Sequence, residues 1–126
     1  MANKRAIYKC DLCGNVVEVY TEGIGDLVCC GEEMNEMNAK TEDKTEEKHV
    51  PSIRTDGNKV EVVVGENQEH PMEEKHYIMW IQLNEGDKEH IKFLKPNDEP
   101  KAVFEVESTD NLSAKEYCNV HGLWKD

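Results

Sequence analysis

The sequence predicts an all-β protein of two parts, in which a small cysteine-rich metal domain precedes a larger antiparallel β-domain. Three observations lead to this fold class. Four of the five cysteines fall within the first 30 residues, short β-branched and aromatic segments recur through the second part, and helical periodicity is scarce. We expect the first domain at residues 1–38, a linker at 39–48 and the second domain at 49–126.

The first part carries two close pairs of cysteines, each followed by a glycine. YKCDLCGN supplies Cys10 and Cys13, and LVCCGEEM supplies Cys29 and Cys30. Four thiolates suit a tetrahedral site for zinc or iron, and so small a domain needs such a staple to fold. A redox disulfide and unrelated buried cysteines are the alternatives, but no βαβ pattern accompanies the first pair. Successive side chains of an extended strand point apart, so the adjacent pair must lie on a distorted turn.

The segment AKTEDKTEEK, residues 39–48, is charged and lacks apolar periodicity, which is typical of an exposed connection. The whole chain has a formal net charge of −12, and such a surface repels phosphate backbones, so we expect no nucleic-acid partner. The N-terminus lacks a signal-peptide core, and no apolar run is long enough to span a membrane. We therefore expect a soluble, cytoplasmic protein with reduced cysteines and no membrane contact.

Four segments of the second part predict β-strands because they are β-branched or aromatic and are bounded by turn-forming residues. They are KVEVVVG (59–65), HYIMWIQL (76–83), EHIKFLK (89–95) and KAVFEVE (101–107). The turns are TDGN (55–58), NEGD (84–87) and KPNDEP (95–100). Strands at such regular spacing indicate an antiparallel sandwich or barrel.

One of the five histidines is predicted to lie on the surface. Alternation along residues 89–95 places Ile91 and Phe93 on one face and His90 with Lys92 on the other, which we interpret as the solvent side.

The other four histidines are His49, His70, His76 and His121. The first two lie close before prolines, which favours extended backbone, and His76 begins the most apolar strand on the face of Ile78 and Trp80. Four imidazoles and the isolated Cys118 indicate a transition-metal site. Nucleophilic catalysis by Cys118 is the alternative, but no orienting third group or oxyanion donor is evident.

The motifs YKCxxCGN, LVCCGE, EKHVP, HPMEEKHYIxWI, FLKP and EYCNxHGxW occur in this order over nearly the whole chain. With them the chain closely resembles desulfoferrodoxin, the two-iron class of superoxide reductase. The resemblance implies a desulforedoxin- or rubredoxin-like domain with iron on Cys10, Cys13, Cys29 and Cys30. It also implies an immunoglobulin-like β-sandwich whose iron is bound by His49, His70, His76 and His121 at the equator and by Cys118 as axial thiolate.

The resemblance further implies the one-electron reduction of superoxide to hydrogen peroxide, a rubredoxin-type electron donor and a homodimer. It assigns roles to Glu47 and Lys48 beside the open coordination position, and a lysine there would attract superoxide to an otherwise acidic protein. The four-cysteine site would serve electron transfer or structure, and zinc is a possible occupant of it in recombinant protein. Two alternatives stay open: a zinc-ribbon adaptor with a partner-binding β-domain, and a rubredoxin-type electron carrier whose His/Cys site is structural.

Overall fold

The computed structural model describes residues 2–42, 48–65 and 70–126. The chain separates into two compact units, Met1–Asn38 and Ala39–Asp126. Every regular element in the described ranges is a β-strand, so the all-β class predicted from the sequence is confirmed. Within those ranges, no helix has the length and apolar character needed to cross a membrane.

The first unit is built from five very short strands. They are β1 (Ile7–Lys9), β2 (Val16–Glu18), β3 (Val28–Cys29), β4 (Glu32–Glu33) and β5 (Asn35–Glu36). One sheet has the order β2-β1-β5, and β3 pairs with β4 alone. Among its described residues, the buried apolar side chains are few: Ala2, Ile7, Tyr8 and Cys10. A core of this size is too small to hold a domain together by apolar burial alone.

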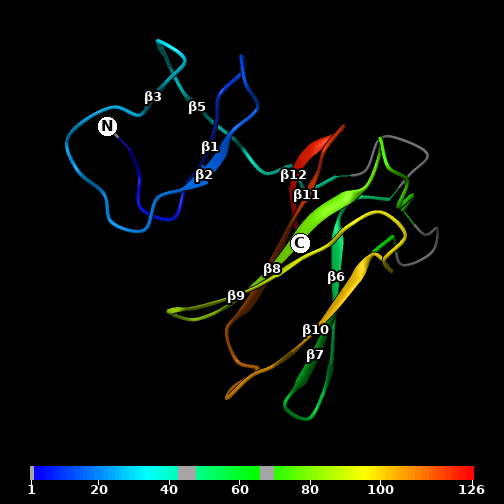
Figure 1. Ribbon diagram of the computed structural model, residues 1–126. Coiled ribbons are helices and arrows are strands. Elements are labelled where there is room, and N and C mark those ends of the chain that lie inside the picture. The colour runs from blue at the N-terminus through cyan, green and yellow to red at the C-terminus, as the bar shows by residue number, and fades with distance from the viewer. Residues whose placement is uncertain (1, 43–47, 66–69) are drawn as a thin grey trace. The chain divides into compact units, whose positions relative to one another are not determined.

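The second unit is a sandwich of two antiparallel sheets (Figure 1). One sheet has the order β10-β7-β6, from β6 (Pro51–Asp56), β7 (Lys59–Val64) and β10 (Lys101–Glu105). The other has the order β12-β11-β8-β9, from β8 (Ile78–Glu85), β9 (Lys88–Phe93), β11 (Leu112–Cys118) and β12 (Gly122–Lys125). Three strands facing four is the immunoglobulin-like architecture that the resemblance implies.

The core fills the space between these two sheets. On β7, Val60, Val62 and Val64 are fully buried and alternate with more exposed residues, as expected of a strand with one inward face. Ile81 and Leu83 of β8 belong to the same buried cluster. All four strands predicted from the sequence exist, as β7, β8, β9 and β10, whereas β6, β11 and β12 were not predicted.

A bulge where β8 begins and β11 ends changes which residues face the core. Tyr117 pairs with Trp80, but the next residue, Cys118, pairs with Ile78, so the register shifts between them. Paired residues share a face and successive residues do not, so Ile78 and Trp80 lie on opposite faces. The prediction that His76, Ile78 and Trp80 share one face is therefore wrong. The bulge brings Cys118 and Ile78 together on the inner face.

The predicted orientation of His90 is also wrong. His90 pairs with the buried Leu83 and donates from Nε2 to Glu85 Oε1 at 2.9 Å, whereas Ile91 and Phe93 are 45% and 72% exposed. The reason is that β9 is an edge strand, at the rim of the sandwich. There an inward position can be satisfied by a polar partner instead of by apolar packing.

Candidate metal centres

The first candidate centre is the group of four cysteines in the first unit. Their Sγ atoms lie within 4.8 Å of one another. The Sγ of Cys13 is 3.5 Å from that of Cys29, which is 3.9 Å from that of Cys30. Sulfur atoms that bind one ion tetrahedrally at about 2.3 Å lie about 3.7 Å apart. The cluster therefore has the spacing of a four-thiolate metal site.

Two glycine-containing turns place these thiols. Gly14 and Gly31, which follow the two pairs, have φ of 83° and 78°. The β3–β4 hairpin turns through Cys30, at φ 55°, and Gly31, and positive φ at both central residues is the signature of a type I′ turn. Cys29 ends the strand and Cys30 lies in the left-handed region, so the two side chains reach the same site. The distorted turn predicted for this pair is confirmed.

The ionisation of the thiols shows why the cluster needs a cation. A hydrogen bond from the backbone of Cys13 is the main cause that lowers the pKa of Cys10 from 9.0 to about 7. Hydrogen bonds with neighbouring thiols, that of Cys13 first, raise the pKa of Cys30 to about 12. One thiolate therefore forms readily and the last thiol resists ionisation. A metal ion supplies the positive charge that four adjacent thiolates require.

Asn15 is a residue of this centre that the sequence reasoning did not single out. Its Nδ2 lies 3.7 Å from the Sγ of Cys29, as a donor to sulfur. Amide donors of this kind orient a thiolate and offset part of its charge. Its position directly after Cys13-Gly14 was the available signal.

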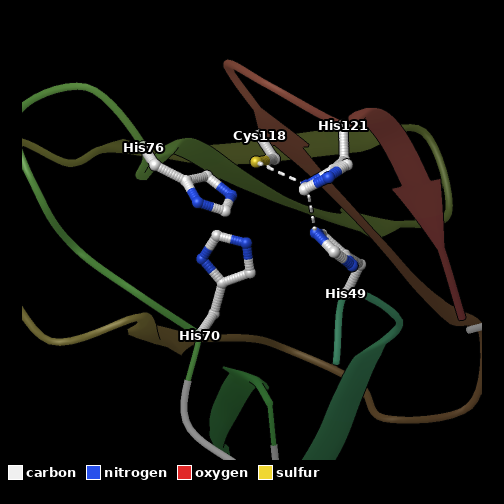
Figure 2. A group of neighbouring side chains, drawn as sticks. All are labelled: His49, His70, His76, Cys118 and His121. Atoms are coloured by element: carbon white, nitrogen blue, oxygen red, sulfur yellow. Dashed lines mark hydrogen bonds between the residues drawn. The ribbon is translucent and has the colours of Figure 1, made fainter. Parts of the chain in front are cut away.

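The second candidate centre lies in the second unit. One ligating atom from each of His49, His70, His76, Cys118 and His121 lies within 4.8 Å of the others. All five side chains point toward one common space (Figure 2). The structure thus brings together the five residues that the sequence analysis grouped.

Four separate segments deliver these side chains. His49 lies just before β6, His70 and His76 lie in the connection that leads into β8, Cys118 ends β11, and His121 lies in the turn to β12. His49, His70 and Cys118 are almost completely buried. The site therefore stands at one end of the sandwich core, and Cys118 is itself part of the core cluster.

The donor atoms fit a transition-metal ion. His49 Nε2 and His121 Nδ1 are 3.0 Å apart, and two nitrogens that bind one ion at right angles, each at about 2.1 Å, have that spacing. His70 uses Nδ1 against the carbonyl oxygen of Pro71 at 2.7 Å, which directs its Nε2 to the site. His76 Nε2 is buried and has no hydrogen-bond partner among the described residues. Imidazole and thiolate donors suit iron, copper and zinc ions.

The side chain of Asn119 ties two parts of the second centre together. Its Oδ1 accepts from Tyr77 N at 2.9 Å and its Nδ2 donates to Lys75 O at 3.0 Å. These two peptide groups flank His76, while Asn119 directly follows Cys118. One amide therefore fixes the turn that carries Cys118 against the segment that carries His76. Sequence reasoning did not find this role, although Asn119 lies inside the motif EYCNxHGxW.

Trp124 supports His49, another donor of the second centre. Its indole stacks on the imidazole of His49, with ring centroids 4.6 Å apart and planes 14° from parallel. The indole is 3% exposed, so it forms an apolar wall beside the ring. A stacked wall of this kind holds the imidazole in one orientation.

Lys48 and Glu47 were the two residues expected beside the open position. Lys48 is exposed and directly precedes the buried His49. Glu47 lies outside the described residues. Their predicted roles stay predictions.

Comparison with known proteins gives the chain its relatives. A family model described as desulfoferrodoxin matches residues 41–126, and one described as desulfoferrodoxin, N-terminal domain, matches residues 2–37. The chain is 54% identical over 125 residues to a desulfoferrodoxin homolog of Archaeoglobus fulgidus, and the match covers 99% of this chain and 98% of that protein. It is 36% identical to a superoxide reductase of Thermococcus kodakarensis, over 74% of this chain and 96% of the relative.

A solved structure extends this likeness to the fold. The crystal structure of the superoxide reductase from Treponema pallidum is similar with a TM-score of 0.78 and 26% identity, over 96% of both chains. The resemblance predicted from the motifs is confirmed by these matches. Two family models that together span nearly all residues, and relatives of about the same length, place this chain in the desulfoferrodoxin family.

Proposed function

We propose that this chain is a superoxide reductase, an oxidoreductase that converts superoxide to hydrogen peroxide at a non-haem iron held by His49, His70, His76, Cys118 and His121. The observation that carries the proposal is the convergence of four imidazoles and one thiolate at the end of the core. The relatives from Thermococcus kodakarensis and Treponema pallidum, both named superoxide reductases, support the same activity.

The donor set suits the chemistry of a one-electron reductant. Four neutral imidazoles and one thiolate leave a ferrous ion with a net charge of +1, and +2 after oxidation. Five donors are one fewer than a six-coordinate ion accepts, which leaves room for a small anion. Bound ferrous iron supplies the one electron that superoxide takes up. The buried Cys118 contributes a negative charge that favours the oxidised state afterwards.

The chain must also attract an anion and allow two protons to reach it, since superoxide plus one electron and two protons gives hydrogen peroxide. We assign the first task to Lys48, whose exposed ammonium belongs to the residue next to His49. We assign to Glu47 the role of a carboxylate beside the open coordination position of the same metal site.

We assign the four-cysteine group to a second iron, in electron transfer or in structure. Its four thiolates leave no position for a substrate, which supports a role other than catalysis. Zinc can take the same four sulfurs, because tetrahedral thiolate sites accept both metals. A rubredoxin-type protein is the proposed electron donor, and the cytoplasm is the proposed location.

We also propose a homodimer, and the domain limits 1–38 and 49–126 with the linker 39–48. The first unit supports the homodimer because it exposes apolar side chains that its small core does not use. Tyr20 is 75% and Ile24 95% exposed. A second copy of the chain would remove such side chains from water.

The test of the function is the stoichiometry of superoxide consumption by the full chain with a chemical reductant. A reductase yields one hydrogen peroxide for each superoxide and releases no dioxygen. The electron that each superoxide takes up comes from the reductant through the protein, and not from a second superoxide. A dismutase yields one hydrogen peroxide and one dioxygen for each two superoxide ions. Dioxygen release at that ratio, or consumption no faster than free iron gives, would refute the proposal.

Metal content is measured on the same preparation, purified without added metal. Two irons for each chain support both assignments, and one iron with one zinc keeps the reductase and makes the four-cysteine site structural. Zinc alone, persisting after growth in iron-rich medium, contradicts the proposed function and favours the zinc-ribbon adaptor.

A further inference from the structure

Lys40 is held against the strand that follows the second centre, although it belongs to the charged segment 39–48. Its backbone N donates to Leu123 O at 3.0 Å, and its carbonyl oxygen accepts from Lys125 N at 2.9 Å. Lys40 thereby forms a parallel bridge with Trp124 of β12. These contacts lie within the second unit, Ala39–Asp126, and fix where the side chain of Lys40 begins.

The side chain of Lys40 reaches two groups that support the donors. Its Nζ donates to the carbonyl oxygen of His121 at 3.0 Å. The same Nζ lies 5.1 Å from the ring centroid of Trp124, which stacks on His49. An ammonium at this distance from an indole is within the range of a cation–π interaction. One lysine therefore contacts the peptide of one donor and the aromatic wall of another.

The two donors concerned are neighbours in the site. His49 Nε2 and His121 Nδ1 are 3.0 Å apart and lie on the same side of the group in Figure 2. Lys40 is exposed, so solvent screens its charge in part. Both its backbone and its ammonium are held by the contacts above, however. A fixed charge acts on the same atoms at all times, unlike a lysine that moves freely in solvent.

We propose that Lys40 is a positioning residue of the five-donor site. It holds the turn that carries His121 and places a permanent positive charge at the carbonyl of His121 and at the indole that stacks on His49. This inference rests on the proposed function for the metal and the substrate. A positive charge disfavours the more positive, oxidised state of the site. It also attracts superoxide toward a chain whose formal net charge is −12.

The experiment compares Lys40→Met, which keeps the length of the side chain but removes the charge, with Lys40→Arg, which keeps the charge. Lys59→Gln is the matched control, because Lys59 is an exposed lysine at the start of β7 and its loss changes the net charge equally. The midpoint potential of the iron-loaded His/Cys centre is measured for each full-length protein by redox titration with electron paramagnetic resonance. Iron content and the rate of superoxide consumption at several ionic strengths are measured in parallel.

We expect Lys40→Met to lower the midpoint potential, so that the ratio of oxidised to reduced protein at a fixed potential rises about threefold. Lys40→Arg restores the potential of the unchanged protein, and Lys59→Gln leaves it unchanged. A second expectation is a smaller salt dependence of the superoxide rate for Lys40→Met than for Lys59→Gln.

Two results would overturn the role of Lys40. One is a Lys40→Met protein with full iron content and an unchanged potential, and the other is an equal shift in Lys59→Gln. The potential does not depend on superoxide, so these results are separate from a failure of the proposed function. A failure of the proposed function would appear in the protein without substitutions, which would then consume no superoxide, whatever the midpoint potential of its iron.

Discussion

The two metal-binding groups of this chain differ in how the fold supplies their donors. The four cysteines come from two turns within the first unit, and Cys13 and Cys30 are exposed. The five residues of the second group come from four segments between positions 49 and 121, and His49, His70 and Cys118 are almost completely buried. The first group is local and partly exposed, and the second is long-range and enclosed by a core.

This difference indicates opposite relations between metal and fold. The first unit has a very small apolar core, so a metal ion there contributes to folding itself. The second unit buries a continuous cluster of valine, isoleucine and leucine side chains, so we expect its fold to bring the histidines together before any ion binds. The sandwich organises its site, whereas the metal organises the first unit.

The largest effect is expected from removing one donor of each group. Cys118→Ala should lower the rate of superoxide consumption by more than about 100-fold, since even a residue outside the donor set costs about 10- to 100-fold. Cys13→Ser should remove the metal of the first unit and leave substantial consumption at the second. The measurement is the superoxide rate together with metals for each chain.

A control for folding accompanies this pair. Both variants should keep the amide protection of β7 and β8. Cys13 lies outside the sandwich, and Cys118→Ala removes only the contacts of one sulfur from the core between the sheets. Complete loss of activity in a folded Cys13→Ser protein would show that the first centre is obligatory, and the two groups would then act as one electron path.

Metal removal should separate the two units. A strong chelator under reducing conditions should abolish the amide protection of β1 and β2 and leave that of β7, β8 and β11 close to its original level. Structural zinc contributes about 10–16 kcal/mol in small domains, as much as the whole stability of a typical protein. Hydrogen exchange of the full chain measures this effect, and re-addition of metal is the control. Equal loss of protection in both units would contradict the comparison.

Sequence reasoning reached the donors because their residue types are rare and chemically specific. The two cysteine pairs could be assigned from spacing alone, since their site is local. The four histidines could be grouped only by their number and by the motifs, and the bulge that turns Cys118 inward was not visible in the alternation of β8. Spacing along one strand cannot show a register shift against its neighbour.

One of the strands that were missed has a composition that does not favour strands. β11 contains Ser113, Ala114, Lys115 and Glu116, yet it lies between β12 and β8 and forms ladders on both sides. Its strand conformation comes from tertiary pairing rather than from propensity. Asn119 and Lys40 were missed for a related reason, because their partners lie 42 and 81 residues away in the chain.

A smaller effect is expected when the support of a donor is removed instead of the donor. Asn119→Ala deletes both hydrogen bonds to the peptides that flank His76, so the affinity of the second site for metal should fall about 10- to 100-fold. The measurement is a metal competition titration of the full chain. Asn84→Ala is the matched control, since its amide bonds Ser113 within the same sheet at 3.5 Å. An equal fall in both variants would mean that the sheet as a whole, not Asn119, positions the site.

The smallest effect concerns a carboxylate that stabilises the sandwich without any metal. Glu85, at the end of β8, accepts from His90 at 2.9 Å and from the backbone N–H groups of Glu107 and Ser108 at 2.9 and 3.1 Å. The hydrogen bond with His90 is the main cause that holds its pKa below the ordinary value of 4.5, with the two backbone donors and Lys88 adding to it. A lowered folded pKa means that this stabilisation is complete above the unfolded value and is lost as the pH falls through the folded one.

Glu85→Gln should therefore lower the melting temperature of the second unit by a few degrees at pH 7, and the difference from the unchanged protein should shrink steadily below pH 4.5. Glu89→Gln is the control, because it removes a carboxylate from the adjacent strand β9, where Glu89 accepts from the side chain of Gln82 at 3.2 Å. Thermal unfolding is followed by circular dichroism with metal bound and after chelation. If the comparison between the units is correct, the Glu85 effect has the same size in both, because it belongs to the part of the chain whose fold does not depend on the ion. An effect that vanishes on chelation would show that the sandwich, like the first unit, relies on its metal.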